Sequence, residues 1–236
     1  MSKRTEEAAF LLHFTPYRET SLIVDLFTRE HGRVAAVAKG ARRPRSALRA
    51  VLLQFQPLTV GYMGRSELRT LTGAEWAGGL IAPKGDALIC AFYLNELIVR
   101  LLPREDPHPA LYDGYFAALQ SLSALAPIDE TLRRFEWLLL RETGYAPDLE
   151  SDAQDRPIDP ETRYAWQPGE GFVAAEPSRG GGGLVLGATL RELAAGSFAS
   201  AATRTQAKYL TRAILAHHLD GATLNTRQIL IDLQKL

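Results

Sequence analysis

GRVAAVAKGARRPRSALR, residues 32–49, combines the apolar run of a buried strand with a purely cationic segment. Val34 to Ala38 has the length and composition of a buried strand. Gly40 and Pro44 break regular structure after it, which predicts a loop. The loop and its flank hold five cations and no acidic residue: Lys39, Arg42, Arg43, Arg45 and Arg49. Like charges this close repel one another, so the stretch is either a solvated surface loop or a binding site for a polyanion.

The sequence around this stretch predicts a small barrel. Strands are expected at residues 8–13, 20–28, 33–38, 51–63 and 67–76, with turn residues between them. Pro57 lies inside the fourth of these and implies an edge or a bulge there. Five short strands in so few residues suit a five-stranded barrel, and such barrels are often OB-folds, a platform for single-stranded nucleic acid.

Helices follow the predicted barrel, beginning after a change of composition near Pro83. They are expected at residues 85–102, 107–124, 129–143, 189–195, 201–218 and 226–236. Residues 146–187 are rich in Pro, Gly and Asp and predict an irregular insert with short strands at 163–166 and 171–174. The fold class is therefore α+β, with domains at 1–80 (barrel), 81–146 with 188–236 (helical) and 147–187 (insert).

Charge is distributed unevenly along a chain whose net charge is zero. Residues 1–80 hold 12 Lys and Arg against 7 Asp and Glu, a net of +5, whereas residues 81–150 hold 6 against 11, a net of −5. This asymmetry indicates separate partners for the two regions. The only cysteine, Cys90, excludes an internal disulfide and a cysteine-based zinc site, and fits a reducing cytoplasm. No signal peptide and no membrane span are expected.

No catalytic constellation is evident in the sequence. Glycine-rich phosphate-binding motifs are absent, and His217 and His218 point about 100° apart on a helix, which makes them poor joint metal ligands. Glu96 lies among apolar residues, which favours a structural hydrogen bond. The remaining carboxylates of the middle third do not cluster, so a nuclease is the less favoured enzymatic alternative.

Two further features leave alternatives open. Tyr17, in a predicted turn, is the best candidate for an exposed ring that stacks on bases, although packing in the core or turn is the competing interpretation. Arg133 and Arg134 lie in an apolar helix of the acidic region. They either form helical ion pairs with Asp129 and Glu130 or clamp the carboxylate of a partner beside an apolar groove.

Four segments carry a family resemblance. ETSLIVDLFTREHGRVAAVAKGARRPRS (residues 19–46), YLNELIVRLL (93–102), LRRFEWLLLRETGY (132–145) and LNTRQIL (224–230) resemble, in the same order, segments of the RecO family of bacterial DNA repair proteins. The similarity spans nearly the whole chain, and the first segment is long and specific.

The resemblance implies an N-terminal OB-fold, a helical domain and a small zinc-finger-like module. It implies a non-enzymatic cytoplasmic, nucleoid-associated mediator that binds single- and double-stranded DNA and anneals complementary strands. With RecR, such proteins help load RecA onto DNA coated by single-stranded-DNA-binding protein. We expect DNA contacts from Arg33, Lys39, Arg42, Arg43, Arg45 and Arg49. Of these, Lys39, Arg42 and Arg43 match the AKGARR motif. Arg133, in LRRFE, is expected to bind the acidic tail of the coating protein.

One departure from the family pattern concerns zinc. Many relatives carry four cysteines after a GYxPxL segment, which is present here at residues 144–149. The stretch that follows offers Asp152 and Asp155 but no cysteine, and two aspartates do not make a structural zinc site. We therefore predict no zinc or other cofactor, in an insert held by packing alone. The alternative function is a scaffold that binds proteins without touching DNA.

Overall fold

The computed structural model describes residues 5–175, 183–198, 200–226 and 228. By internal contacts the chain forms two compact units, the first reaching Ala126 and resuming at Leu224, the second spanning Pro127–Thr223. We call them unit 1 and unit 2. This grouping differs from the predicted domains, because the first two long helices share a unit with the barrel.

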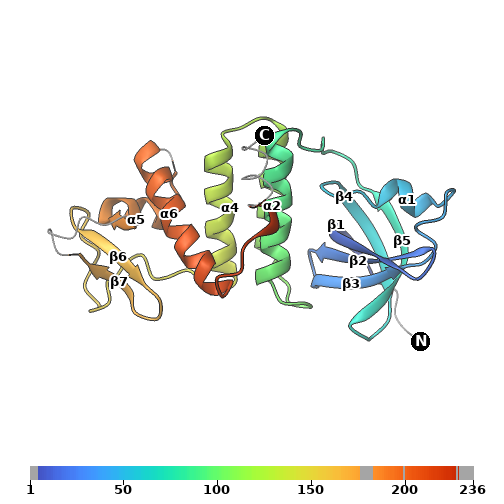
Figure 1. Cartoon of the computed structure of the whole chain (residues 1–236), viewed down its shortest axis with the longest axis horizontal. Helices are drawn as coiled ribbons and strands as arrows, with labels where there is room; N and C mark the ends of the chain where they lie inside the picture. Colours follow the sequence, from blue (N-terminus) through green and yellow to red (C-terminus); the bar gives the residue numbers. More distant parts are fainter. Residues whose placement is uncertain (1–4, 176–182, 199, 227, 229–236) are drawn as a thin grey trace. The chain divides into compact units, whose positions relative to one another are not determined.

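The elements of the two units follow one another along the chain as shown in Figure 1. Unit 1 contains β1 (Thr5–Tyr17), β2 (Ser21–Thr28), β3 (Gly32–Ala38), α1 (Ala47–Val51), β4 (Pro57–Met63), β5 (Leu68–Trp76), α2 (Asp86–Leu101) and α3 (Pro109–Ser123). Unit 2 contains α4 (Ile128–Glu142), β6 (Arg163–Gln167), β7 (Gly171–Ala174), β8 (Leu184–Leu186), α5 (Gly187–Ala194) and α6 (Ala201–His218).

Five strands of unit 1 form a closed barrel in the order β1-β2-β3-β5-β4. All neighbouring strands are antiparallel except β3 and β5, which are parallel. This is the OB-like barrel followed by helices that the sequence predicts. Apolar side chains that alternate along the strands fill the barrel, among them Leu11, Val24, Leu26, Val60 and Tyr62.

The fourth strand is shorter than predicted. Residues 51–53 look like a strand because they are apolar, but Val51 ends the short helix α1 and β4 begins only at Pro57. Phe55 between them has a positive φ of 64°, which extended pairing does not allow. A proline is tolerated as the first residue of a strand, so Pro57 lies at the start of β4 rather than at an internal bulge.

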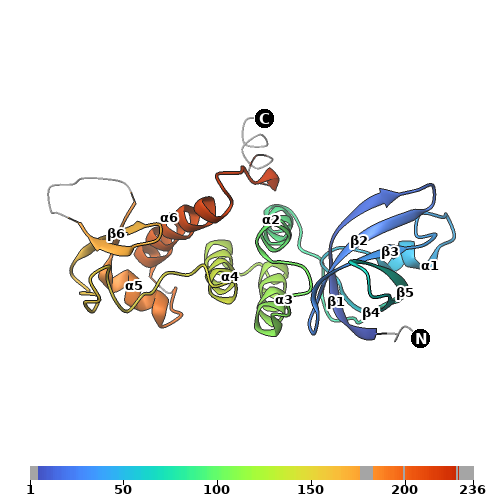
Figure 2. The ribbon, with the colours of Figure 1, turned by 90° about the horizontal axis from the view of Figure 1, so that it is seen from below.

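Helices α2 and α3 lie side by side and pack against the barrel (Figure 2). Phe10 on β1 contacts Tyr112 and Tyr115 of α3, with ring centroids 5.3 Å and 5.0 Å away. The Tyr115 hydroxyl donates to Asn95 on α2, and the Asn95 amide donates to the Leu12 carbonyl of β1 at 2.9 Å. An aromatic cluster and a buried hydrogen-bond chain thus join the helices to the barrel.

The turn between β2 and β3 depends on Gly32. Its φ is +67°, and a Cβ atom there would lie 2.0 Å from the backbone oxygen of Asp106. Only glycine therefore allows the loop after α2 to approach the hairpin so closely.

In unit 2, helices α4 and α6 pack together, and β7-β6-β8 form a small antiparallel sheet. Strands β6 and β7 match the two short strands predicted in the insert, whereas β8 was not predicted. Residues 180–182 of the glycine run, and residues 227 and 229–236 of the last predicted helix, lie outside the described residues.

Candidate nucleic-acid interface

The cationic loop, as we call residues 39–49, folds into turns after β3 and ends in α1, which carries Arg49. Lys39, Arg42, Arg43, Arg45 and Arg49 are all exposed. The Arg42 amide donates to the Thr20 carbonyl at 2.9 Å, and the Arg43 amide donates to the Gly40 carbonyl at 3.0 Å. The loop is therefore anchored to the turn between β1 and β2 rather than extended into solvent without support.

These five cations differ in their partners from three other arginines of unit 1. Arg29, Arg69 and Arg104 each form an ion pair with a carboxylate. Within the described part of the chain, none of the five loop cations does so, and the Arg42 guanidinium reaches only the backbone carbonyls of residues 18 and 19, at 3.5 Å and 3.3 Å. Their charge is therefore available to an external anion.

A groove of about 530 Å³ runs beside this loop, and we call it the cationic groove. Arg42 and Arg49 line it together with Phe14 of β1, Leu53 and Gln54. Phe14 and Leu53 are large apolar side chains that stay 43% and 53% exposed. Cations beside an exposed aromatic ring are the combination with which proteins bind single-stranded nucleic acid.

The exposed ring is Phe14 rather than the Tyr17 that the sequence favours. Tyr17 is half-buried, and the Arg18 guanidinium lies 5.1 Å from its ring centroid. The register between β1 and β2 shifts between Leu11 and His13, and such a bulge re-aims the side chains that follow it. The sequence shows the aromatic residue at 14 but not the bulge, so its exposure could not be derived.

Arg33 is a correction to the predicted set of DNA contacts. It is only 7% exposed, and its guanidinium pairs with Asp25 of β2 at 2.7 Å. The same group donates to the carbonyls of Val99 and Leu102, at 2.7 Å and 2.6 Å, which are acceptors at the end of α2. Arg33 therefore ties the barrel to a helix terminus and has no free face for a phosphate.

Arg133 in unit 2 is buried rather than exposed, at 4% of its surface. It pairs with Glu136 one turn ahead at 2.5 Å, and Thr211 of α6 donates to the other oxygen of Glu136 at 2.8 Å. Among the residues that the structure describes, the Nε and Nη1 atoms of Arg133 find no hydrogen-bond partner. Arg134 forms the predicted pair with Glu130 at 2.8 Å, whereas Arg133 does not pair with Asp129.

Glu96 has the structural role that the sequence favours. Its carboxylate accepts hydrogen bonds from the amides of Asn225 and Thr226, at 2.8 Å and 2.9 Å, and from the Thr226 hydroxyl at 2.7 Å. Burial alone would raise the pKa of Glu96, but these hydrogen bonds and Arg100 together hold that pKa below its ordinary value. The segment after α6 is thereby fastened to α2.

Asp152 of the insert accepts hydrogen bonds from the backbone. The Asp152 carboxylate accepts from the amides of Gln154 and Arg156 and from the Arg156 guanidinium, which lowers the pKa of Asp152. Asp155 does not share this site. Among the residues that the structure describes, no three His, Cys, Asp or Glu side chains are placed to hold a metal ion. The absence of zinc remains a prediction, which metal analysis of the purified protein tests.

The N-terminal and the C-terminal parts of the chain both match models of the same protein family. Residues 1–80 match the family model described as "Recombination protein O N terminal", and residues 83–228 match "Recombination protein O C terminal". A protein of Ralstonia nicotianae named DNA repair protein RecO is 50% identical over 98% of this chain and 86% of its own length. Proteins of the same name from Burkholderia pseudomallei and Polynucleobacter asymbioticus are each 49% identical over 98% of this chain, and over 84% and 97% of their own lengths. No helix in the described part of the chain is long and apolar enough to cross a membrane.

Proposed function

Because the chain belongs to the RecO family of bacterial DNA repair proteins, we propose that it is a recombination mediator that binds single- and double-stranded DNA at the cationic groove. In this role it anneals complementary strands and, with RecR, helps load RecA onto DNA coated by single-stranded-DNA-binding protein. The single observation that supports DNA contact at this place is the set of five exposed cations in residues 39–49, which pair with no carboxylate of the described residues.

The proposed chemistry is electrostatic. Phosphates of two complementary strands repel each other, and neutralising them on a cationic surface lowers the cost of bringing their bases together. The loop is anchored by backbone hydrogen bonds, so part of the ordering cost is met before DNA arrives. Five phosphate contacts on a single strand give a slope of about −3.5 in a plot of log affinity against log salt concentration.

The test is fluorescence anisotropy of a labelled single-stranded oligonucleotide across a salt series. Changing Arg42, Arg43 and Arg45 together to Ala removes three contacts, so the slope should fall in magnitude by about 2. A matched control removes three exposed arginines outside the groove: Arg65, Arg141 and Arg212. If the loop variant and the control bind alike, DNA does not bind at this loop.

The role proposed is stoichiometric rather than catalytic, since the protein holds strands and does not cleave them. The corresponding measurement is incubation of end-labelled DNA with the protein and magnesium, after which the DNA should remain intact. Shortened products that appear in proportion to the protein added would favour the nuclease alternative.

We further propose that the acidic tail of single-stranded-DNA-binding protein binds unit 2 at Arg133. The supporting observation is a buried guanidinium with two donor atoms that have no partner in the described part of the chain, an arrangement that a carboxylate would satisfy. The Arg133 guanidinium is buried in the structure, so the side chains that cover it must move when the tail binds. Arg133 and Glu136 should be changed together, to Met and Gln, because removing Arg133 alone takes the cation away from the buried Glu136 carboxylate.

Binding of a labelled acidic peptide that ends in phenylalanine tests this second proposal. The double variant should lose peptide binding and keep its affinity for DNA. A peptide with an amidated C-terminus is the matched control, since it lacks the carboxylate and should bind the wild type weakly. Equal binding of the two peptides to the wild type would contradict a role for the guanidinium.

A further inference from the structure

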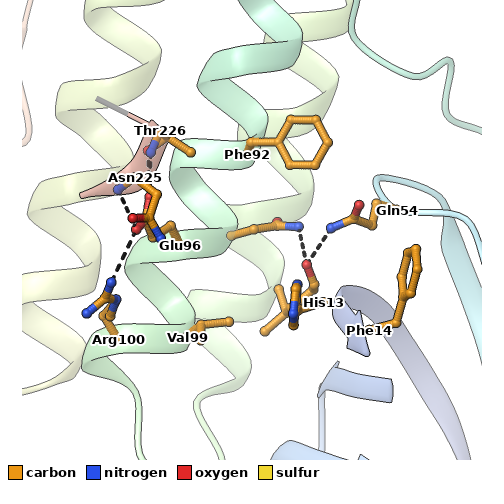
Figure 3. Close-up of a pocket in the computed structure, with 11 residues that line it drawn as sticks. His13, Phe14, Gln54, Phe92, Glu96, Val99, Arg100, Asn225 and Thr226 are labelled. Atoms are coloured by element: carbon orange, nitrogen blue, oxygen red, sulfur yellow. Dashed lines mark hydrogen bonds and ion pairs between the residues drawn. The ribbon is translucent and has the colours of Figure 1, made fainter. Parts of the chain in front are cut away.

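A second groove of about 470 Å³ adjoins the cationic groove within unit 1 (Figure 3). We call it the aromatic groove. Phe14 and Gln54 line both grooves, so the two grooves adjoin at these residues. From there the aromatic groove runs along α2, where Phe92 and Arg100 line it, and reaches the segment after α6.

The floor of the aromatic groove is held in place by hydrogen bonds. The Leu12 carbonyl of β1 accepts from the side-chain amides of Gln54 and Asn95, at 2.5 Å and 2.9 Å. The side-chain oxygen of Asn95 accepts in turn from Tyr115 at 2.5 Å. Strand β1, helix α2 and the segment that carries Gln54 thus meet at the Leu12 carbonyl. A ligand would therefore enter a site that is already organised.

Two aromatic rings are exposed in this groove. Phe14 is 43% exposed and Phe92 is 38% exposed, although both are large apolar side chains. The ring of Phe92 is supported by the buried Phe55, with centroids 4.8 Å apart at an angle of 83°. Figure 3 shows the rings of Phe14 and Phe92 to either side of Gln54. Supported rings that stay exposed on both sides of a groove suit flat ligands such as bases.

The far end of the aromatic groove carries a cation. Arg100 lies across the groove from Phe14 (Figure 3), and it forms an ion pair with Glu96 at 3.6 Å, longer than an ordinary hydrogen bond. The Glu96 oxygens are already engaged by the amides of Asn225 and Thr226. The guanidinium of Arg100, with 38% of its side chain exposed, therefore keeps donors for another anion.

We propose that a DNA single strand runs from the cationic groove into the aromatic groove. Its bases stack on Phe14 and Phe92, and a phosphate is held by Arg100. Two observations support this path: the grooves adjoin at Phe14 and Gln54, and cations lie at both ends of the stretch that carries the exposed rings. The inference rests on the proposed function and adds to it a strand preference. A duplex keeps its bases stacked on each other, so only a single strand can use the aromatic groove.

The experiment measures affinity against strand length by anisotropy, with oligo(dT) of about 4 to about 20 nucleotides, a range that brackets the sites of OB-type barrels. Short strands should occupy the cationic groove, where the charge is greatest, and longer ones should gain affinity by entering the aromatic groove. Phe92→Leu keeps apolar packing but loses the ring face, so it should weaken long strands by about 5- to 150-fold, the equivalent of roughly 1–3 kcal/mol for one stacked base. It should leave short strands unchanged.

Two further variants make the test specific. Arg100→Gln should reduce the magnitude of the salt slope by about 0.7 for long strands only. Phe92→Tyr keeps an aromatic ring and should retain the gain in affinity with strand length. This variant separates the loss of stacking from a loss of folded structure. Tyr209→Leu is the control, because Tyr209 is an exposed ring on α6 of unit 2.

The outcomes distinguish this inference from the proposed function. Length-dependent affinity that Phe92→Leu and Arg100→Gln abolish supports the path. If wild-type affinity does not rise with length, or rises equally in both variants, the path is wrong, and the groove serves another ligand such as a peptide. In that case salt-dependent binding of short strands still upholds the proposed function. If neither short nor long strands bind, both proposals fail.

Discussion

Changing Arg33 to Ala should unfold the protein more easily without altering how its DNA affinity responds to salt. The change removes a buried ion pair with Asp25 and two hydrogen bonds to carbonyls at the end of α2. Asp25 would keep only Arg104, at 3.5 Å. Breaking a buried pair by removing one partner costs about 3–5 kcal/mol, a large part of the roughly 5–15 kcal/mol by which domains are stable.

Urea denaturation followed by circular dichroism measures this cost. With an m-value of about 2 kcal/mol per molar urea, a loss of 3–5 kcal/mol lowers the midpoint by about 1.5–2.5 M. The matched variant is Arg43→Ala, an exposed arginine of the cationic loop, whose stability should change by no more than about 0.5 kcal/mol.

The two variants should behave in opposite ways in the DNA assay. Arg43→Ala should reduce the magnitude of the salt slope by about 0.7, and Arg33→Ala should not change it at temperatures where that variant is folded. An Arg33→Ala protein with the wild-type urea midpoint and a shallower salt slope would refute the assignment of Arg33 to the interior.

Three further predictions follow from buried or crowded groups. Arg133→Ala should destabilise unit 2 by about 3–5 kcal/mol in urea. Changing Arg133 and Glu136 together to Met should cost far less, because it removes both buried charges. Equal losses in the two variants would contradict the ion pair. Gly32→Ala should lower the melting temperature by several degrees. The new Cβ would lie 2.0 Å from the backbone oxygen of Asp106 at a φ of +67°, a strain of about 1–3 kcal/mol or more. An unchanged melting temperature would count against that close approach. The pKa of Glu96 is lowered in the folded protein, so its contribution is complete above the unfolded pKa of 4.5 and is lost as the pH falls through the lowered value. The protection of the Asn225 and Thr226 amides from hydrogen exchange, taken relative to the intrinsic exchange rate at each pH, should therefore fall in acid, and Glu96→Gln should remove that dependence.

The barrel could be predicted because its evidence is local. Alternating apolar residues and turn residues between them mark β1, β2, β3 and β5 in the sequence, and the strand order follows from the OB-like topology. Residues 51–53 misled the prediction, since a short apolar run fits a strand or a helix equally well. Strand β8 has three residues beside a run of glycines, too short for any periodicity to show.

The site could be predicted only where charge and exposure coincide. The loop cations are exposed because glycine and proline keep their segment out of the sheet. Arg33 belongs to the same cluster in sequence, but its strand pairs with β2, which carries Asp25, and that partner is distant along the chain. The exposure of Phe14 depends on a bulge, and the partner of Arg133 was one of several carboxylates within reach on the helix.

The return of the chain to unit 1 at Leu224 has a consequence for biosynthesis. The barrel and its cationic loop lie within residues 5–76, but Asn225 and Thr226, which line the aromatic groove, are translated much later. At about 5–20 residues per second, roughly 7–30 s separate residue 80 from residue 226 on the ribosome. A nascent or truncated chain that ends before Leu224 would thus carry the electrostatic half of the surface without its complete aromatic half.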